Sequence, residues 1–361
     1  MMTSDFAQRL FFIFLIFLLV LFFIRLTEFR NIFQNYPAEA LWDASIFIFR
    51  TPSKIAPKMN SFALFRESDI ILVSAFFPVN ISKTHSHAGY KKYAHNLLPR
   101  IIAPMIVYTS EWGKKFIDFH GNNYIHWNTS IEKVLDIEWV AQVDAVLKEQ
   151  EKVDPEICRH SYEKYLVWHS KFYLLHEVSN MYPNSYVFWL DIGSIRWTPL
   201  YPESYRFPDR QKVLKAVPKN DMIFFALNRA NRKFPYIPEY IYPINAVIGG
   251  VYGGSNFAIR NFFSYVTYIR ESLKDQFFGK EQNLQTTYAF NFPKTKLVLM
   301  LASPGVHYSC EWFGYMSYFG THDSCKAENF TLKDSREYLY YTAESDFEKS
   351  KEEMRKIADH C

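Results

Sequence analysis

Near the middle of the chain stands the segment Tyr186-Val187-Phe188-Trp189-Leu190-Asp191-Ile192-Gly193. Its apolar residues run without interruption and end at one carboxylate, and a glycine follows two positions later. A continuous apolar run of this length is typical of a strand buried on both faces, as in a parallel sheet. The sequence therefore predicts a buried strand that places Asp191 at its carboxyl end.

Four further apolar runs have the same character, at 69–77, 105–109, 222–227 and 296–301. Helical patterns lie between several of them, and the clearest covers about 160–180, where apolar residues recur on one helix face. Strands that alternate with helices predict an α/β fold with a doubly wound, mostly parallel sheet. In such sheets ligands bind beyond the carboxyl ends of the strands, which is where Asp191 is expected.

The amino-terminal part of the chain contains a run without polar residues, Leu10 to Ile24, between Arg9 and Arg25. As a helix it would span about 22 Å, which is short for a typical bilayer but tolerable in a thinner one. We expect a short tail (1–9) and a single transmembrane anchor (10–26). A cleaved signal peptide is the alternative, and the positive charges on both sides leave the orientation undecided.

After the predicted anchor, the proline-containing residues 27–67 are expected to form a stem, 68–330 the globular body, and 331–361 a charged tail. Glycosylation sequons at Asn80, Asn128 and Asn329 favour a lumenal body, although each sequon is a weak motif alone. All four cysteines lie on the same side. The simplest pairing joins Cys310 to Cys325. These features predict a single-pass protein of the Golgi or endoplasmic reticulum.

Composition limits the possible partners. Hydrophobic residues make up 49% of the chain and charged residues 22%, so a packed core is expected. The net charge of +4 and the lack of a Lys/Arg block argue against a nucleic-acid partner. Aromatic residues reach 19%. Their rings can stack on sugars, which suits a carbohydrate enzyme, but filling of the core is the simpler explanation.

Two segments are candidates for ligand binding. Asp191 can hold a divalent cation that neutralises a diphosphate, or it can cap the following turn. The second segment is Gly249-Gly250-Val251-Tyr252-Gly253-Gly254. Its glycines indicate either close approach of the backbone to a ligand or a bulged strand.

Three more side chains are candidates for chemistry. Lys171 interrupts an apolar helix face, so it either pairs with Asp191 or a phosphate or extends its amine to water. Glu281 stands with Gln282 at the start of a predicted helix. Its carboxylate can act as a general base or bind sugar hydroxyls, or it can simply be a favourable acid in the first turn of the helix. His307 follows the last apolar run. It can be a metal ligand or a structural histidine.

Taken together, these segments resemble the HtrL/YibB-like family, also called WlaTC-like, in its membrane-anchored nematode-type form. The matching pieces lie in order over residues 70–310, from the strand around Ser74 to Glu281-Gln282. The family is regarded as glycosyltransferase-like with a GT-A-type fold. The resemblance implies that Ser74 and Ala75 lie near a nucleotide and Asp191 near metal and diphosphate. It places Gly249, Gly250, Gly253 and Gly254 near the sugar and counts Gln282 among the residues that bind the nucleotide sugar.

One feature departs from GT-A enzymes generally, because the usual Asp-x-Asp is here Asp191-Ile192-Gly193. Glu281 or His307 would have to supply the missing ligand for Mn²⁺ or Mg²⁺. The resemblance implies sugar transfer from a nucleotide-diphospho-sugar to a glycan, lipid or protein acceptor. The alternatives are an inactive, membrane-tethered glycan-binding protein of the same fold and a metal-dependent hydrolase.

Overall fold

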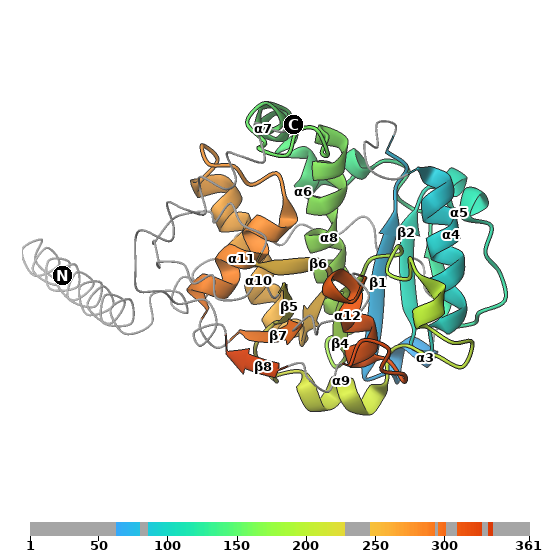
Figure 1. Cartoon of the computed structure of the whole chain (residues 1–361). Helices are drawn as coiled ribbons and strands as arrows, with labels where there is room; N and C mark the ends of the chain where they lie inside the picture. The colour runs from blue at the N-terminus through green and yellow to red at the C-terminus, as the bar shows by residue number, and fades with distance from the viewer. Residues whose placement is uncertain are drawn as a thin grey trace, which may run out of the picture. The chain divides into compact units, whose positions relative to one another are not determined.

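The computed structural model, shown in Figure 1, describes residues 63–79, 86–227, 246–292, 295–300, 309–326 and 331–334. All of these belong to one unit of the chain, residues 53–361. The predicted anchor at 10–26 and the predicted ligand His307 lie outside the described residues. Among the residues that are described, no helix is long and apolar enough to cross a membrane.

An eight-stranded sheet with the order β3-β2-β1-β4-β6-β5-β7-β8 forms the centre of the described unit. The neighbours β3, β2, β1 and β4 are parallel, as are β5 and β7, whereas β6 and β8 run antiparallel to their neighbours. The predicted α/β class and mostly parallel sheet are therefore confirmed. The strands are β1 (Ile70–Phe76), β2 (Met105–Thr109), β3 (Ile125–Asn128), β4 (Tyr186–Leu190), β5 (Ile223–Leu227), β6 (Val247–Gly254), β7 (Lys296–Met300) and β8 (Thr331–Asp334).

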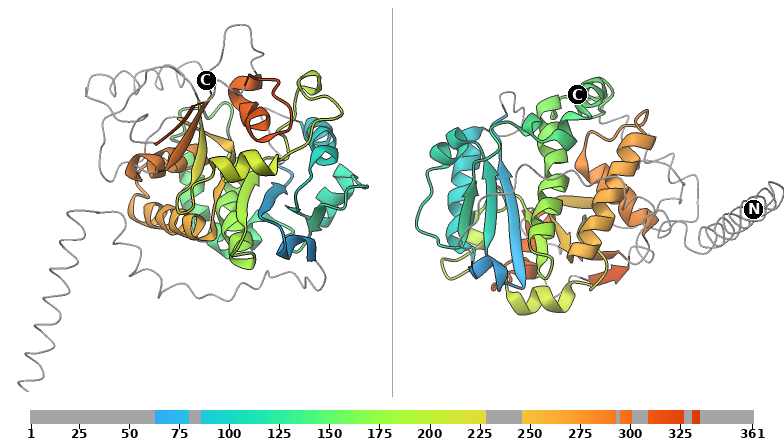
Figure 2. Two further views of the ribbon diagram at one scale, coloured as in Figure 1. Left: turned by 90° about the horizontal axis from the view of Figure 1, so that it is seen from below. Right: turned by 180° about the vertical axis from the view of Figure 1, so that it is seen from behind.

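Helices cover both faces of the sheet (Figures 1 and 2). Alternate residues of β1 enter two different apolar clusters, with Ile71 and Val73 in one and Ile70 and Leu72 in the other. The first cluster includes side chains of α3 (Ala63–Arg66), α6 (Glu138–Ala141), α7 (Asp144–Glu151), α8 (Tyr162–Met181), α10 (Asn256–Ser272) and α11 (Glu281–Asn291). The second includes side chains of α4 (His87–Leu97), α5 (Glu111–Ile117), α9 (Arg210–Ala216) and α12 (Ser309–Phe319). Short 3-10 helices occur at Leu98–Arg100, Val134–Asp136 and Thr198–Leu200.

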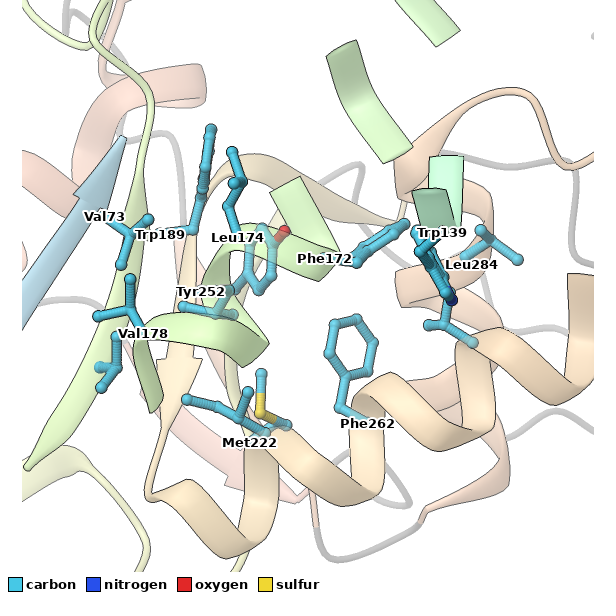
Figure 3. Close-up of a cluster of buried hydrophobic side chains, with 14 of the residues drawn as sticks. Val73, Trp139, Phe172, Leu174, Val178, Trp189, Met222, Tyr252, Phe262 and Leu284 are labelled. Atoms are coloured by element: carbon cyan, nitrogen blue, oxygen red, sulfur yellow. The ribbon is translucent and has the colours of Figure 1, made fainter. Parts of the chain in front are cut away.

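Helix α8 is the central helix of the first cluster, and Figure 3 shows its surroundings. Phe172 packs edge-to-face on Phe262 of α10, with ring centroids 5.4 Å apart, and also lies close to Tyr252 of β6. Leu174 and Val178 are fully buried in the same cluster. Because α8 is enclosed on several sides, any polar side chain on its inner surface must find a partner inside the protein.

The boundaries of the body differ from the prediction at both ends. Phe65 of α3, expected in the stem, is buried in the first apolar cluster, so the body begins before residue 68. Strand β8, expected in the charged tail, pairs with β7 along the edge of the sheet. Both segments were misassigned because short elements carry little periodicity of their own. The predicted disulfide between Cys310 and Cys325 is confirmed and joins α12 to the following loop.

The sequon at Asn128 belongs to a buried part of the fold. Asn128 ends β3, is 4% exposed, and accepts hydrogen bonds at Oδ1 from the backbone and hydroxyl of Ser130. Its Nδ2, the atom that a glycan would modify, has no solvent access. This sequon therefore does not support a lumenal body, and the other two lie outside the described residues.

Candidate functional site

The candidate site forms where β4 ends beside an irregular part of β6. The backbone N–H of Asp191 donates to the carbonyl of Gly250 at 2.8 Å, just beyond the β4 ladder. In the pairing of β6 with β5, Tyr252 lies opposite Phe224, and Val247 lies opposite Ala226. Between these two pairs the chain advances five residues along β6 but only two along β5. Such an excess is a β-bulge, which redirects the backbone locally. The bulge contains Gly249 and Gly250.

Three charged side chains meet at this point. Lys171 Nζ of α8 lies 2.9 Å from Asp191 Oδ1 and 2.9 Å from Glu281 Oε1 of α11. The same amine donates to the Gly249 carbonyl at 3.3 Å. The structure thus brings together three predicted site residues and one predicted glycine, and it selects the paired role of Lys171 over the solvent-directed one.

Burial differs sharply among the three charges. The side chains of Lys171 and Glu281 are 5% and 6% exposed, whereas that of Asp191 is 37% exposed. Burial by itself lowers the pKa of Lys171, but the charges of Asp191 and Glu281 outweigh it, so the pKa lies above its usual value. Lys171 is therefore a permanent cation, and Asp191 is the member of the group that meets solvent.

Neighbouring groups fix the orientation of Asp191. The indole N–H of Trp189, two positions earlier on the same strand face, donates to Asp191 Oδ1 at 2.6 Å. Lys171 Nζ also lies 5.5 Å from the centroid of the Trp189 ring. On the backbone side, Ser194 Oγ donates to the Asp191 carbonyl at 2.6 Å and closes the turn. Asp191 does not cap this turn with its carboxylate, because the carboxylate is engaged by Lys171 and Trp189.

The first glycine pair makes room for the site. A β-carbon at Gly249 would lie 2.4 Å from Glu281 Oε1, and one at Gly250 would lie 2.6 Å from the Tyr315 hydroxyl of α12. Both contacts are closer than real β-carbons approach other atoms. The glycines at 249 and 250 therefore allow α11 and α12 to bring polar side chains against the bulge.

The second glycine pair lies away from Asp191 and allows close packing within the sheet. Gly253 and Gly254 pair with Phe188 and Val187, toward the amino end of β4 and away from Asp191. A β-carbon at Gly253 would lie 2.2 Å from the Val187 carbonyl oxygen. This pair permits close packing of β6 against β4.

The remaining predicted residues have mixed positions. Ser74 of β1 is fully buried, and its Oγ has no hydrogen-bond partner among the described residues. Ala75 packs on the first apolar cluster, beside Val73, which pairs with Trp189. Gln282 is buried and donates to the Val247 carbonyl at 2.6 Å, so it ties α11 to β6.

Glu281 does not have the exposure that a general base acting on an acceptor requires. Its Oε1 accepts from Lys171, and its Oε2 is buried without a hydrogen-bond partner in the described part of the chain. In this arrangement Glu281 binds the Lys171 ammonium on its buried side. Of these two carboxylates, Asp191 is the one that is accessible from solvent.

The sequence did not single out Tyr90, Tyr93 or Arg196, which surround the same edge. Burial raises the pKa of Tyr90, while the charge of Arg196 lowers it and that of Asp191 raises it further. The guanidinium of Arg196 lies 5.5 Å from the ring centroid of Tyr93 and 4.7 Å from that of Phe313. Arg196 also donates to the Gly193 carbonyl at 3.3 Å. The sequence signal that could have identified Arg196 is its position five residues after Asp191, in the loop that follows the carboxyl end of β4.

The described residues do not fit the Mn²⁺ or Mg²⁺ ion that the resemblance implied. Asp191 Oδ1 and Glu281 Oε1, the two carboxylate oxygens that face each other, are both bound by the Lys171 ammonium. In the part of the chain that the structure describes, no three His, Cys, Asp or Glu side chains are grouped as metal ligands.

A separate cavity of about 410 Å³ lies at the amino ends of the parallel strands, at the other end of the sheet from Asp191. Ser68, Asp69, Ala103 and Pro104, at the amino ends of β1 and β2, contribute to its lining, and none of the predicted site residues does. This cavity is therefore distinct from the candidate site.

Comparison with protein-family models and with curated proteins gave no match.

Proposed function

We propose that this chain is a glycosyltransferase with a GT-A-like, doubly wound fold. It transfers a sugar from a nucleotide-diphospho-sugar to a hydroxyl of a glycan, lipid or protein acceptor. The proposal includes a membrane anchor at 10–26 and a body in the lumen of the Golgi or endoplasmic reticulum.

The observation that carries this proposal is the place of Asp191 in the sheet. The strand order runs from β1 outward to β2 and β3 on one side, while β4 flanks β1 on the other. Open α/β sheets bind ligands at the carboxyl end of such a switch in strand order. Asp191 follows β4 at this end, and Ser74 lies near the end of the adjacent β1.

The site residues have distinct roles in this proposal. The half-exposed Asp191 carboxylate accepts hydrogen bonds from sugar hydroxyls and can take the proton of the acceptor hydroxyl. Lys171 is a positioning residue that holds Asp191, and Glu281 positions Lys171. Arg196, whose guanidinium lies near the rings of Tyr93 and Phe313, is assigned to the charge of the leaving diphosphate.

In the transfer step, the bond between the anomeric carbon and the diphosphate oxygen breaks, and its electron pair leaves with the nucleoside diphosphate. A bond forms between the anomeric carbon and the acceptor oxygen, whose proton passes to a base. The residues described are compatible with either stereochemical outcome.

The missing second acid of Asp-x-Asp favours one other function, an inactive protein of the same fold that binds glycans. Nucleotide release separates the two. The full-length chain, purified in detergent, is incubated with a panel of nucleotide sugars and acceptors. The transferase proposal predicts release that falls at least a hundredfold in Asp191→Asn. Asp118→Asn is the matched control, because Asp118 is an exposed helix cap in a left-handed conformation that asparagine tolerates.

Glycan binding without nucleotide release from any donor would support the inactive protein and refute the transferase. Release that is unchanged in Asp191→Asn would refute the assigned site.

A further inference from the structure

The candidate site contains a cation of its own. We infer that the Lys171 ammonium takes the place of a divalent metal ion between Asp191 and Glu281, and that Asp191 binds a neutral sugar hydroxyl without metal. The sugar in this inference rests on the proposed function, whereas the metal-free character of the site rests on the contacts of Lys171 alone.

The first argument is the shared position of the two carboxylate oxygens. Asp191 Oδ1 and Glu281 Oε1 each lie 2.9 Å from Lys171 Nζ, so they are no more than 5.8 Å apart, twice that distance. Two acidic oxygens that converge on one point form a site for a small cation. Here the ammonium already occupies that point.

The second argument is that oxygen atoms surround the ammonium. Lys171 Nζ donates to Glu281 Oε1 and to the Gly249 carbonyl, and it forms an ion pair with Asp191 Oδ1 at 2.9 Å. These three oxygens equal in number the three N–H groups of a lysine ammonium. The oxygens belong to α11, to the β6 bulge and to the residue that follows β4, whereas the lysine belongs to α8. Because these contacts come from several elements and the side chain is buried, Lys171 is held in place and is not free to move to a ligand.

The third argument concerns what can approach Asp191 from solvent. The contacts from Lys171 and Trp189 both go to Oδ1, which leaves Oδ2 as the oxygen that can receive a ligand. A divalent ion on Oδ2, at a bond length of about 2.1 Å, would stand within about 7 Å of the ammonium, because Nζ lies 2.9 Å from the other oxygen of the same carboxylate. In a half-buried site the repulsion between these charges is only partly screened. A neutral hydroxyl meets no such repulsion and donates well to a carboxylate.

Mn²⁺ binding tests the inference without requiring turnover. Electron paramagnetic resonance of free Mn²⁺ is followed as the full-length protein is added in detergent. The wild type is expected to bind no Mn²⁺ at Asp191, so its titration should match that of Asp191→Asn. Mn²⁺ binding by the wild type that Asp191→Asn abolishes would overturn the inference.

Lys171→Met provides the reverse test. With the ammonium removed, the two carboxylates are expected to bind Mn²⁺ at least tenfold more tightly than the wild type does, and Lys171→Met/Asp191→Asn should lose this gain. A folded Lys171→Met protein that gains no Mn²⁺ would overturn the inference. If Lys171→Met does not fold, the comparison of wild type with Asp191→Asn still decides.

Nucleotide release adds a readout that separates this inference from the proposed function. Release that is equal in EDTA and in Mn²⁺ supports both. Release that EDTA abolishes and Mn²⁺ restores in the wild type supports the transferase and overturns the metal-free site. If no nucleotide sugar is turned over, the transferase proposal fails while the Mn²⁺ titrations still decide the inference.

Discussion

Lys171 and Glu281 are 110 residues apart in the sequence, yet they form a buried ion pair with 2.9 Å between Nζ and Oε1. Asp191 completes the group from the solvent side. A buried charge that loses its partner costs about 3–5 kcal/mol. The contribution of each residue to stability therefore depends on what its removal leaves unpaired.

We predict that Lys171→Met lowers the free energy of unfolding by about 3–5 kcal/mol, because it leaves Glu281 buried without a counter-charge. Glu281→Gln should cost less, about 1–3 kcal/mol, because Lys171 keeps Asp191 and an amide acceptor. The double variant Lys171→Met/Glu281→Gln should be more stable than Lys171→Met alone. Urea unfolding measures all three.

The matched control for this series is Lys152→Met. Lys152 forms an ion pair with Glu149 at 2.6 Å, but both side chains are about 70% exposed. Exposed pairs contribute about 0–1 kcal/mol, so this variant should unfold close to the wild type. Equal losses in Lys152→Met and Lys171→Met would contradict the assignment of a buried ion group.

Much of this arrangement was accessible from sequence because it depends on local patterns. The apolar run before Asp191 predicts a buried strand. For Lys171 on an apolar helix face, pairing with Asp191 was one of the expected alternatives, and it is the one that the structure has. The disulfide of Cys310 with Cys325 followed from their short separation. Each of these predictions needed only neighbouring residues or one simple pairing.

What the sequence could not provide was the register between distant strands. Both glycine pairs of β6 looked equivalent as sequence, but the antiparallel pairing with β4 places Gly249 and Gly250 at the site and Gly253 and Gly254 toward the other end. The exposure of Glu281 likewise depends on how α11 packs against the β6 bulge. The contacts of Arg196 with Tyr93 and Phe313 join three distant segments and leave no periodic signal.

The glycine pairs give a second prediction. Gly249→Ala should reduce both stability and activity, because its β-carbon would displace Glu281 Oε1 from 2.4 Å and disturb the hold on Lys171. Gly253→Ala should reduce stability at least as much, because the nearest atom is the Val187 carbonyl oxygen, which is backbone. Overpacking of this kind typically costs about 1–3 kcal/mol or more. Thermal unfolding and nucleotide release per folded molecule distinguish the two effects.

Gly89→Ala is the control for this comparison. Gly89 lies in α4, and its nearest prospective contact is 3.5 Å from an added β-carbon, an ordinary distance. Alanine favours a helix over glycine by up to about 1 kcal/mol, so this variant should be as stable as the wild type or more so. A Gly253→Ala protein with normal stability but lost activity would show that the second pair does belong to the site.

The buried sequon gives a third prediction, that Asn128 carries no glycan in the folded protein. Its Nδ2 has no access to solvent, and its Oδ1 accepts two hydrogen bonds from Ser130. When the chain is expressed in a eukaryotic secretory system, Asn128→Gln should leave the mass released by N-glycosidase unchanged. Asn80→Gln and Asn329→Gln are the comparison variants, and a glycopeptide that contains Asn128 would refute the prediction.

A buried carboxylate in the loop between α7 and α8 gives a fourth prediction, on acid stability. Asp154 lies between α7 and α8 and accepts hydrogen bonds from His160 Nδ1 at 2.8 Å, from the Glu156 backbone at 2.7 Å and from the Tyr165 hydroxyl. Burial alone raises the pKa of Asp154, but these hydrogen bonds outweigh it, and the pKa lies below its usual value. The pKa of the neighbouring Glu156 is lowered as well, because the ammonium of Lys280 at 2.5 Å outweighs the effect of burial.

The sign of the pH effect follows from these directions. A carboxyl group whose pKa is lower in the folded than in the unfolded chain stabilises the fold above the unfolded value, near 4, and loses this contribution as the pH falls through the folded value. Asp154→Asn cannot titrate at this position, so its unfolding free energy should decline less steeply than that of the wild type below about pH 4. Tyr165→Phe keeps the charge but removes one donor, and it should give an intermediate slope.

The same titration should affect the candidate site. Lys280, the partner of Glu156, directly precedes Glu281 at the start of α11, so protonation of Asp154 and Glu156 in acid should also weaken the contact of Glu281 with Lys171. Urea unfolding over pH 3–7 measures the slopes, and identical slopes for Asp154→Asn and the wild type would contradict the lowered pKa.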